Sequence, residues 1–238
     1  MISVITSKNN EKVKYAFSLR LAKNRKQEGK FIGEGKKALE LALQIGVVEQ
    51  VFTYEALDID EAIPQFLVNE EVMEKLSNMS SPEGVVFVAK IPEFKKDNLN
   101  KILFLDGVND PGNLGTLVRT ALSFDYDAVV LGEETVSIYN EKALASCKGA
   151  NYLIPVFSGS LVDYKDGYQI IVSTLSDKSI NPEEVKLEDK FVLVLGNEAR
   201  GVSKKSESLA DSLVKIPMAN INSLNVSVAG GILMYILH

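Results

Sequence analysis

The segment KIPMANINSLNVSVAGGIL, Lys215–Leu233, begins like a buried strand and ends like a buried helix. Four polar residues separate the two parts: Asn220, Asn222, Ser223 and Asn225. Ser223 could cap the helix by accepting a backbone hydrogen bond, which accounts for one of them. Asparagine has only modest helix propensity, so Asn225 inside the helix start needs another reason. The segment therefore predicts polar function inside an otherwise apolar core.

Length and composition place the chain among ordinary soluble globular proteins. It has 238 residues, 46% hydrophobic and 24% charged, which suffices for one large domain or two smaller ones. No apolar run reaches the roughly 18 residues of a membrane span, and an apolar signal core is lacking. A single cysteine, Cys147, excludes an internal disulfide and fits the cytoplasm. The only histidine is His238, which argues against a histidine base and against a metal site.

Charge is distributed unevenly along the chain. The net charge is −6, yet residues 1–37 hold ten basic and three acidic residues, a local +7 that leaves −13 for the remainder. Such a basic segment on an acidic protein indicates a nucleic-acid contact, although a solvated helix face would give the same pattern. The candidate RNA-binding residues are Lys8, Lys12, Lys23, Arg25 and Lys26.

The order of predicted elements divides the chain in two. Residues 1–92 alternate helices and strands, beginning with an amphipathic helix over 9–26, and form a small α/β domain. Residues 93–99 are polar and form the linker, and 100–238 alternate apolar strands with helices, which predicts a parallel, doubly wound sheet. Strands are expected at KFIGEG, VEQVFTY, GVVFVAKI, KILFLDGV, YDAVVLGEE, LIPVF, YQIIVST, KFVLVLGNE and SLVKIP, and further helices at KKALELALQIG, NEEVMEKLSN, NLGTLVRTALSF, NEKALASCKGA and from about Ser223.

Three segments leave predicted strands with polar, glycine-bearing turns. They are LDGVNDPGNLGTLVRTA, VLVLGNEARGVS and the segment quoted first. Ligands of open parallel sheets bind at the carboxyl ends of the strands, so these turns are the candidate site. Surface turns with a local ion pair remain the alternative. Neither a G-x-x-x-x-G-K-[ST] phosphate loop nor a G-x-G-x-x-G turn occurs, which argues against a Rossmann dehydrogenase and a Rossmann-type methyltransferase.

In this order, the three segments resemble the motifs of the SpoU/TrmH family of RNA 2′-O-ribose methyltransferases. NDPGNLGTLVRTALSF is similar to motif 1, LVLGNEARGVS to motif 2 and IPMANINSLNVSVAGGI to motif 3, so the resemblance runs from about Leu103 to the C-terminus. The N-terminal part resembles the ribosomal-protein-like substrate-binding domain of many members. One departure is Ala199, where the family often has glycine.

The resemblance implies a fold, a cofactor and a set of site residues. The fold is an α/β domain with a C-terminal trefoil knot, an exception to the rule that chains are unknotted. S-Adenosylmethionine would bind in the knot, mostly to backbone groups of Gly196, Ile216 and Leu224. The protein would be a homodimer that meets through the last helix, Ser223–Leu237. The implied catalytic residues are Asn113, Arg119, Glu198, Ser223 and Asn225.

The implied reaction is attack of a ribose 2′-hydroxyl on the methyl sulfonium, for which alignment supplies much of the rate. The hydroxyl must lose a proton, and three bases stay open: Glu198, Arg119, or a substrate phosphate positioned by Arg119. The family proposal is the arginine. Since arginine side chains stay protonated in proteins, clamping a phosphate is the physically easier role.

Two other functions are compatible with parts of the sequence. The first is a catalytically silent RNA-binding protein with the same fold, which should have lost Arg119, Glu198 or Asn225; all three are present. The second is a nucleotide-binding metabolic enzyme, which the basic N-terminal segment and the missing phosphate loops disfavour. We therefore expect a cytoplasmic methyltransferase that acts on rRNA or tRNA.

Overall fold

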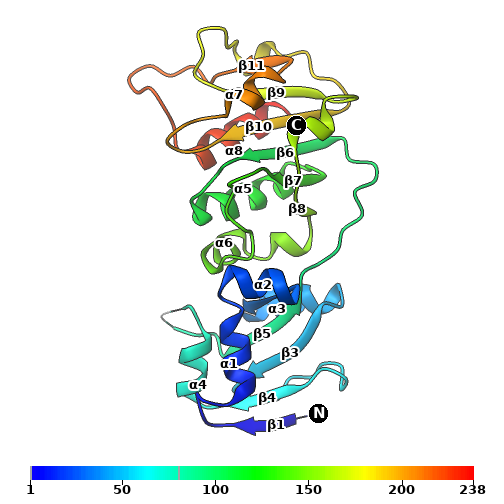
Figure 1. The fold of residues 1–238 in the computed structure, drawn as a ribbon, viewed down its shortest axis with the longest axis vertical. Coiled ribbons are helices and arrows are strands. Elements are labelled where there is room, and N and C mark those ends of the chain that lie inside the picture. The colour runs from blue at the N-terminus through cyan, green and yellow to red at the C-terminus, as the bar shows by residue number, and fades with distance from the viewer. Residues whose placement is uncertain (1, 80) are drawn as a thin grey trace. The chain divides into compact units, whose positions relative to one another are not determined.

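The computed structural model describes residues 2–79 and 81–238, which fall into two compact units. One unit runs to Glu93 and includes Tyr139–Leu144, and the other comprises Phe94–Ile138 and Ala145–His238. The predicted linker, 93–99, contains neither helix nor strand. Each unit has a sheet of its own (Figure 1).

The first unit is built on a mixed five-stranded sheet in the order β1-β4-β3-β5-β2. β1–β4 and β4–β3 pair in parallel, whereas β3–β5 and β5–β2 pair antiparallel. The sequence analysis missed β1 and β4, because four-residue strands carry too little periodicity to be recognised. The strands are β1 Ile2–Ile5, β2 Lys30–Glu34, β3 Val48–Thr53, β4 Gln65–Val68 and β5 Val85–Lys90, and the helices are α1 Glu11–Ser18, α2 Ala22–Glu28, α3 Lys36–Gln44 and α4 Glu70–Leu76.

The prediction of one continuous helix over 9–26 is wrong. The chain turns between α1 and α2, where Leu19 is fully buried and Leu21 adopts an extended conformation before α2. The guanidinium of Arg25 donates to the carbonyls of Leu19 and Arg20, groups that the interrupted helix leaves without helical partners. A buried arginine thus stabilises the corner that a straight amphipathic helix would not have needed.

The second unit is built on a six-stranded sheet in the order β11-β9-β10-β6-β7-β8, and all its described strand pairs are parallel. The predicted parallel sheet is confirmed. The strands are β6 Lys101–Asp106, β7 Ala128–Leu131, β8 Val156–Ser158, β9 Gln169–Ser173, β10 Phe191–Gly196 and β11 Ser212–Val214. The helices are α5 Pro111–Ser123, α6 Glu141–Cys147, α7 Lys204–Ser208 and α8 Val226–Ile236, with 3-10 turns η1 Ala150–Tyr152, η2 Leu161–Tyr164 and η3 Pro182–Glu184.

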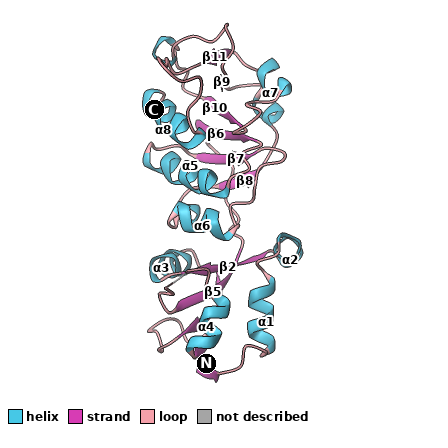
Figure 2. Ribbon diagram, turned by 90° about the vertical axis from the view of Figure 1, so that its left-hand side faces the viewer, coloured by secondary structure: helices cyan, strands magenta, loops and turns pink. Residues whose placement is uncertain are grey.

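The two faces of this sheet are covered differently. Helices α5 and α8 lie on one face and α7 on the other (Figure 2). On the α7 face, a buried cluster including Phe104, Val130 and Val194 is closed by η2 through Leu161. Strands buried on both faces explain the nearly continuous apolar runs of the sequence.

Close packing between α5 and α8 depends on Gly230. A Cβ atom at this position would meet Leu117 Cδ2 and lie 2.7 Å from Leu195 Cδ1, and both leucines are buried. At Gly231 the nearest atom to an added Cβ is Thr120 Cγ2 at 3.9 Å, an ordinary contact. The close approach of α8 to α5 and the sheet therefore requires glycine at position 230 but not at position 231.

Gly230→Ala should destabilise the protein by about 1–3 kcal/mol, because the added methyl overpacks a filled core. The matched variant Gly231→Ala should be neutral or gain up to about 1 kcal/mol from better helix propensity. Chemical denaturation of both variants measures the difference. Gly230→Ala with wild-type stability would mean that α8 does not pack this closely.

Candidate active site

Three loops meet at the carboxyl edge of the parallel sheet: residues 107–110 after β6, residues 197–203 after β10, and residues 215–225 after β11. Asn197 joins the first two, because its Nδ2 donates to the Gly107 carbonyl at 2.7 Å. Its Oδ1 accepts from the backbone amides of Ala199 and Arg200 at 2.9 and 3.0 Å. Asn197 is a positioning residue that the sequence analysis missed; its place directly after a strand and a glycine was the available signal.

Glu198 holds the loop after β6 with both carboxylate oxygens. Oε1 accepts from the Asp110 amide at 3.1 Å and from Asn113 Nδ2 at 3.0 Å, and Oε2 accepts from the Asn109 amide at 3.2 Å. Partial burial by itself raises the pKa of Glu198. Hydrogen bonds from the Asn113 side chain and from the backbone amides of Glu198, Asn109 and Asp110 outweigh it, and the net pKa is lowered. The carboxylate is a poor proton acceptor at neutral pH.

Asn113 connects this cluster to α8. Its Oδ1 accepts from Asn225 Nδ2 at 3.1 Å, while Asn225 Oδ1 caps α8 by accepting from the amides of Ser227 and Val228. Ser223 was predicted to be the helix cap, and that prediction is wrong: the helix begins at Val226 and Asn225 precedes it. An asparagine at the N-cap has a structural reason, and its amide nitrogen is left to bind Asn113.

The remaining catalytic candidates, Arg119 and Ser223, take no part in this hydrogen-bonded network. Arg119 is exposed on α5, and within residues 2–79 and 81–238 its guanidinium makes no hydrogen bond or ion pair. Ser223 is exposed and lines the neighbouring cavity. The fold thus brings Asn113, Glu198 and Asn225 together and leaves Arg119 free to contact a ligand.

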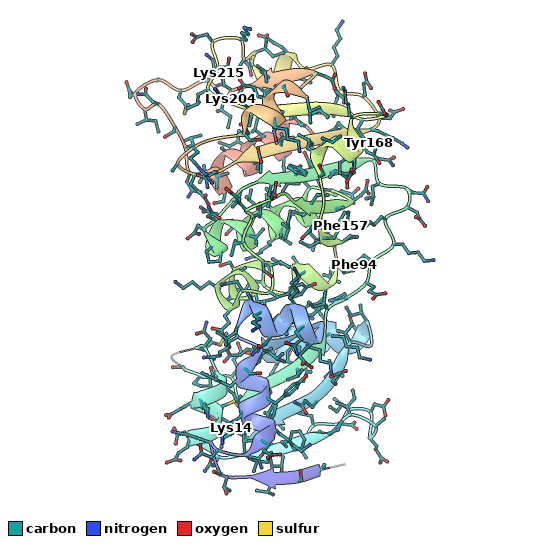
Figure 3. All side chains as sticks on the ribbon, viewed as in Figure 1. Lys14, Phe94, Phe157, Tyr168, Lys204 and Lys215 are labelled. Atoms are coloured by element: carbon teal, nitrogen blue, oxygen red, sulfur yellow. The ribbon has the colours of Figure 1, made fainter. Side chains whose placement is uncertain are left out.

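A cavity of about 670 Å³ opens beside Glu198, between the loops after β9, β10 and β11. All three predicted cofactor-binding residues, Gly196, Ile216 and Leu224, line it. Apolar side chains and backbone groups share its wall with Lys204 and Lys215, which Figure 3 shows near α7 and β11. The cavity therefore combines a surface for a flat apolar group with polar and cationic positions.

Glycine is required at position 196 because the backbone of the following turn packs directly against it. A Cβ atom there would meet the backbone of Gly201 and Val202, with the Gly201 carbonyl oxygen only 2.6 Å away. A side chain at position 196 would therefore collide with the protein's own backbone. Such a side chain would displace the turn that carries Glu198.

The basic residues of the first unit divide into two groups. Lys8, Lys12, Lys23 and Lys26 are exposed, as an RNA contact requires. Arg25 is only 6% exposed and is committed to backbone carbonyls, so its predicted role in RNA binding is wrong. Exposed Phe17 adds an aromatic surface flanked by Arg20 and Lys75, whose charged groups lie 4.9 and 5.5 Å from the ring centroid.

No group of three or more His, Cys, Asp or Glu side chains in residues 2–79 and 81–238 could hold a metal ion. Across those same ranges, no helix is long and apolar enough to cross a membrane.

Comparison with known proteins identifies the family. Residues 100–235 match the model of the SpoU rRNA Methylase family, and residues 10–86 match the MRM3-like substrate binding domain. The chain belongs to the SpoU methylase family. The parallel sheet and C-terminal segment are accordingly those of the knotted methyltransferase fold, as the resemblance implied.

Individual relatives cover nearly the whole chain. The protein is 32% identical over 241 residues to the 23S rRNA (guanosine(2553)-2′-O)-methyltransferase RlmP of Bacillus subtilis, covering 97% of each chain. Among solved structures, an AdoMet-bound rRNA methyltransferase from Sinorhizobium meliloti is 25% identical with a TM-score of 0.90, covering 99% of this chain and 97% of that one. An RNA 2′-O ribose methyltransferase is 26% identical with a TM-score of 0.81, covering 99% and 98%.

Glu198→Gln should lower the free energy of unfolding by about 1 kcal/mol at pH 7, because an amide nitrogen then faces a backbone donor in a largely solvated site. Because the pKa of Glu198 is lower in the folded protein than in the unfolded chain, its carboxylate stabilises the fold at pH above the unfolded-state pKa. This stabilisation is lost as the pH falls through the folded-state pKa. The wild-type advantage should therefore shrink below the ordinary glutamate range, near pH 4.3. Denaturation at pH 7 and pH 3 tests this. A constant difference would contradict it.

Proposed function

We propose that this protein is an S-adenosylmethionine-dependent 2′-O-ribose methyltransferase that acts on 23S rRNA. The observation that carries the proposal is the hydrogen-bonded chain Glu198–Asn113–Asn225 beside the 670 Å³ cavity. The family assignment supplies the reaction class. The Bacillus subtilis relative, which aligns over nearly the whole chain, supplies the RNA.

The cavity fits the cofactor on its own residues. Leu195, Ile216 and Leu224 offer an apolar surface for an adenine ring, and backbone groups of the surrounding loops offer polar contacts. Lys204 or Lys215 would neutralise the amino-acid carboxylate. When bound, S-adenosylmethionine supplies the activated methyl group.

Protein side chains supply the alignment of the ribose. Glu198 fixes the loop after β6 and stays ionised, so it is a positioning residue rather than the base. Asn113 and Asn225 hold the two helix starts at a fixed separation. The exposed Arg119 binds the phosphate beside the target ribose, and that phosphate or a water takes the hydroxyl proton. The catalytically silent alternative is disfavoured, because these residues are all in place.

The first unit, 1–92 in our proposal, binds the RNA outside the reacting nucleotide. Its exposed lysines provide the charge for phosphate contacts, and Phe17 provides a surface on which a base can stack. Because rRNA is the substrate, we place the protein in the cytoplasm.

We also propose a homodimer that forms through α8. Val228 and Tyr235 are 50% and 63% exposed, and their spacing of seven residues puts them on one helix face. Tyr235 continues into an aromatic cluster with Phe124 and His238, at centroid distances of 6.0 and 5.7 Å. A second copy of the same face is the partner that covers this surface.

The decisive experiment maps 2′-O-methyl groups on 23S rRNA from cells with and without the gene. We expect one 2′-O-methyl group to be lost without the gene, at the nucleotide equivalent to guanosine 2553, the position for which the Bacillus subtilis relative is named. Complementation with the wild-type gene should restore it. An unchanged 23S rRNA pattern would contradict the proposed substrate.

Arg119→Ala should slow single-turnover methyl transfer by about 10²–10³-fold, the consequence of losing a charged transition-state contact of roughly 3–4 kcal/mol. Arg119→Lys should recover little, since it keeps the charge but not the planar fork. Cofactor binding, measured by calorimetry, should be unchanged in both variants. A wild-type rate for Arg119→Ala would remove Arg119 from the mechanism.

Replacing Lys12, Lys23 and Lys26 together by Gln should weaken RNA binding and flatten its salt dependence, because fewer counterions are released. The matched control replaces three exposed lysines of the second unit, Lys165, Lys178 and Lys186. Binding titrations at several salt concentrations give both slopes. If the affinity of the wild type and of the first variant depends equally on salt concentration, the N-terminal basic residues do not contact the RNA and only face solvent.

Tyr235→Glu should shift the protein from dimer to monomer, because it places a charge within an apolar contact. The control Val162→Glu changes an exposed apolar residue away from α8, 45% exposed, and should leave the dimer intact. Sedimentation at micromolar concentration distinguishes the two. A wild-type protein that sediments as a monomer would refute the dimer itself.

A further inference from the structure

A second cavity, of about 770 Å³, lies at the carboxyl ends of β6, β7 and β8 and beside the turn after β10. None of the catalytic or cofactor-binding residues named above lines it, although the positioning residue Asn197 does, and the proposed mechanism leaves the cavity without a role. Its size falls within the range of roughly 300–1,000 Å³ typical of small-molecule sites. The cavity thus requires an explanation of its own.

The cavity lies where the winding of the sheet reverses. The chain proceeds from β6 to β7 and β8 on one side, then returns to place β9 and β10 on the other side of β6. In open parallel sheets this crossover point, at the carboxyl ends of the strands, is where ligands bind. The cofactor cavity is instead beside the C-terminal segment, so the crossover position is a separate site.

The walls of this cavity combine an apolar floor with polar groups at the strand ends. Phe104, Leu131 and Leu161 are buried and form an apolar floor. Asp106 and Ser158 lie at the ends of their strands; Asp106 uses Oδ2 to accept from the Ser203 amide at 2.7 Å, which leaves Oδ1 as an acceptor. Such a wall suits a flat ring carrying polar edge groups and hydroxyls.

Charge limits what can enter the interior. Asp106, Glu133 and Glu134 outnumber Arg200 and Lys205 among the lining residues, and Arg200 is paired with Glu134 at 2.7 Å. A phosphate inside would face the Asp106 carboxylate. Exposed Lys205 leaves room for a phosphate at the rim only.

We propose that this second cavity binds a nucleoside, with the base on the apolar floor and the ribose hydroxyls donating to Asp106. A carboxylate at a strand end that binds ribose hydroxyls is a recurrent solution in parallel sheets. The nucleoside is either part of the RNA substrate or a free molecule. Binding of an RNA nucleotide rests on the proposed function, whereas binding of a free nucleoside does not.

The position of the cavity favours the RNA as source. Asn197, Arg200, Gly201 and Val202 line both cavities, so one turn of chain separates the nucleoside site from the cofactor site. The same turn carries Glu198, which holds the loop with Asn113. A nucleotide next to the methylated one would reach the second cavity while its neighbour lies at the active site.

Two variants and two controls test the site. Ser158→Phe fills the cavity from its edge, and Asp106→Asn removes the charge while keeping an acceptor for the Ser203 amide. The controls Val162→Phe and Asp177→Asn introduce the same two residue types at exposed positions that line neither cavity. All four are compared as full-length proteins saturated with S-adenosylmethionine, so that nucleosides cannot enter the cofactor cavity.

The first measurement is an NMR titration with adenosine, guanosine, cytidine and uridine, followed at the amides of Gly132 and Gly159, which line the cavity. The second is the KM for the RNA in methyl transfer. A free nucleoside as ligand predicts amide shifts in wild type and controls that Ser158→Phe abolishes. An RNA nucleotide as ligand predicts that Ser158→Phe raises KM about tenfold or more with kcat unchanged, as expected for one lost base contact.

Either result supports the site. Asp106→Asn should change the same measurement in the same direction as Ser158→Phe, by a smaller amount. The assignment is overturned when neither measurement responds, or when the controls respond as strongly as the variants. If the protein proves not to methylate RNA, the titration alone decides, so failure of the proposed function is distinguishable from failure of this site.

Discussion

The Glu198 carboxylate is the constraint on which the active site depends. Two backbone amides from the loop after β6 and the side-chain amide of Asn113 in α5 donate to it, and Asn113 also accepts a hydrogen bond from Asn225 at the start of α8. The Glu198 carboxylate thereby holds together three segments that are distant in sequence, and its hydrogen bonds stabilise the ionised form over the protonated form. The arrangement separates positioning from proton transfer, since the group that organises the loops is unsuited to be the base.

Much of this site could be predicted from the sequence, because its signals are local. Apolar runs followed by glycine and polar residues identified the strand ends, and the parallel sheet then required those ends to share an edge. Asn113, Glu198 and Asn225 lie in those segments, where the resemblance to the SpoU/TrmH family implied their roles, and hydrogen bonds join them in the structure. The reason for Gly196 could not be predicted, because the clash it avoids is with backbone five residues further along.

The errors in the first unit have a different origin. An amphipathic pattern over 9–26 is satisfied equally well by one helix or by two with a corner, because periodicity records which face is apolar and not where the axis bends. Arg25 was counted as surface charge, yet the carbonyls released at the corner required a donor. The short strand β1 pairs with β4 more than sixty residues further along the chain, a separation that no local window contains.

The hydrogen bond between Asn113 and Asn225 spans 112 residues of chain, and it has a kinetic consequence. Contacts of such sequence separation form late, because the entropy of closing the intervening loop must be overcome first. The helix that Asn225 caps is also the last helix in the chain, and it packs onto a sheet whose strands are not in sequential order. Partly folded chains therefore lack the site altogether, and each active molecule is one that has completed folding.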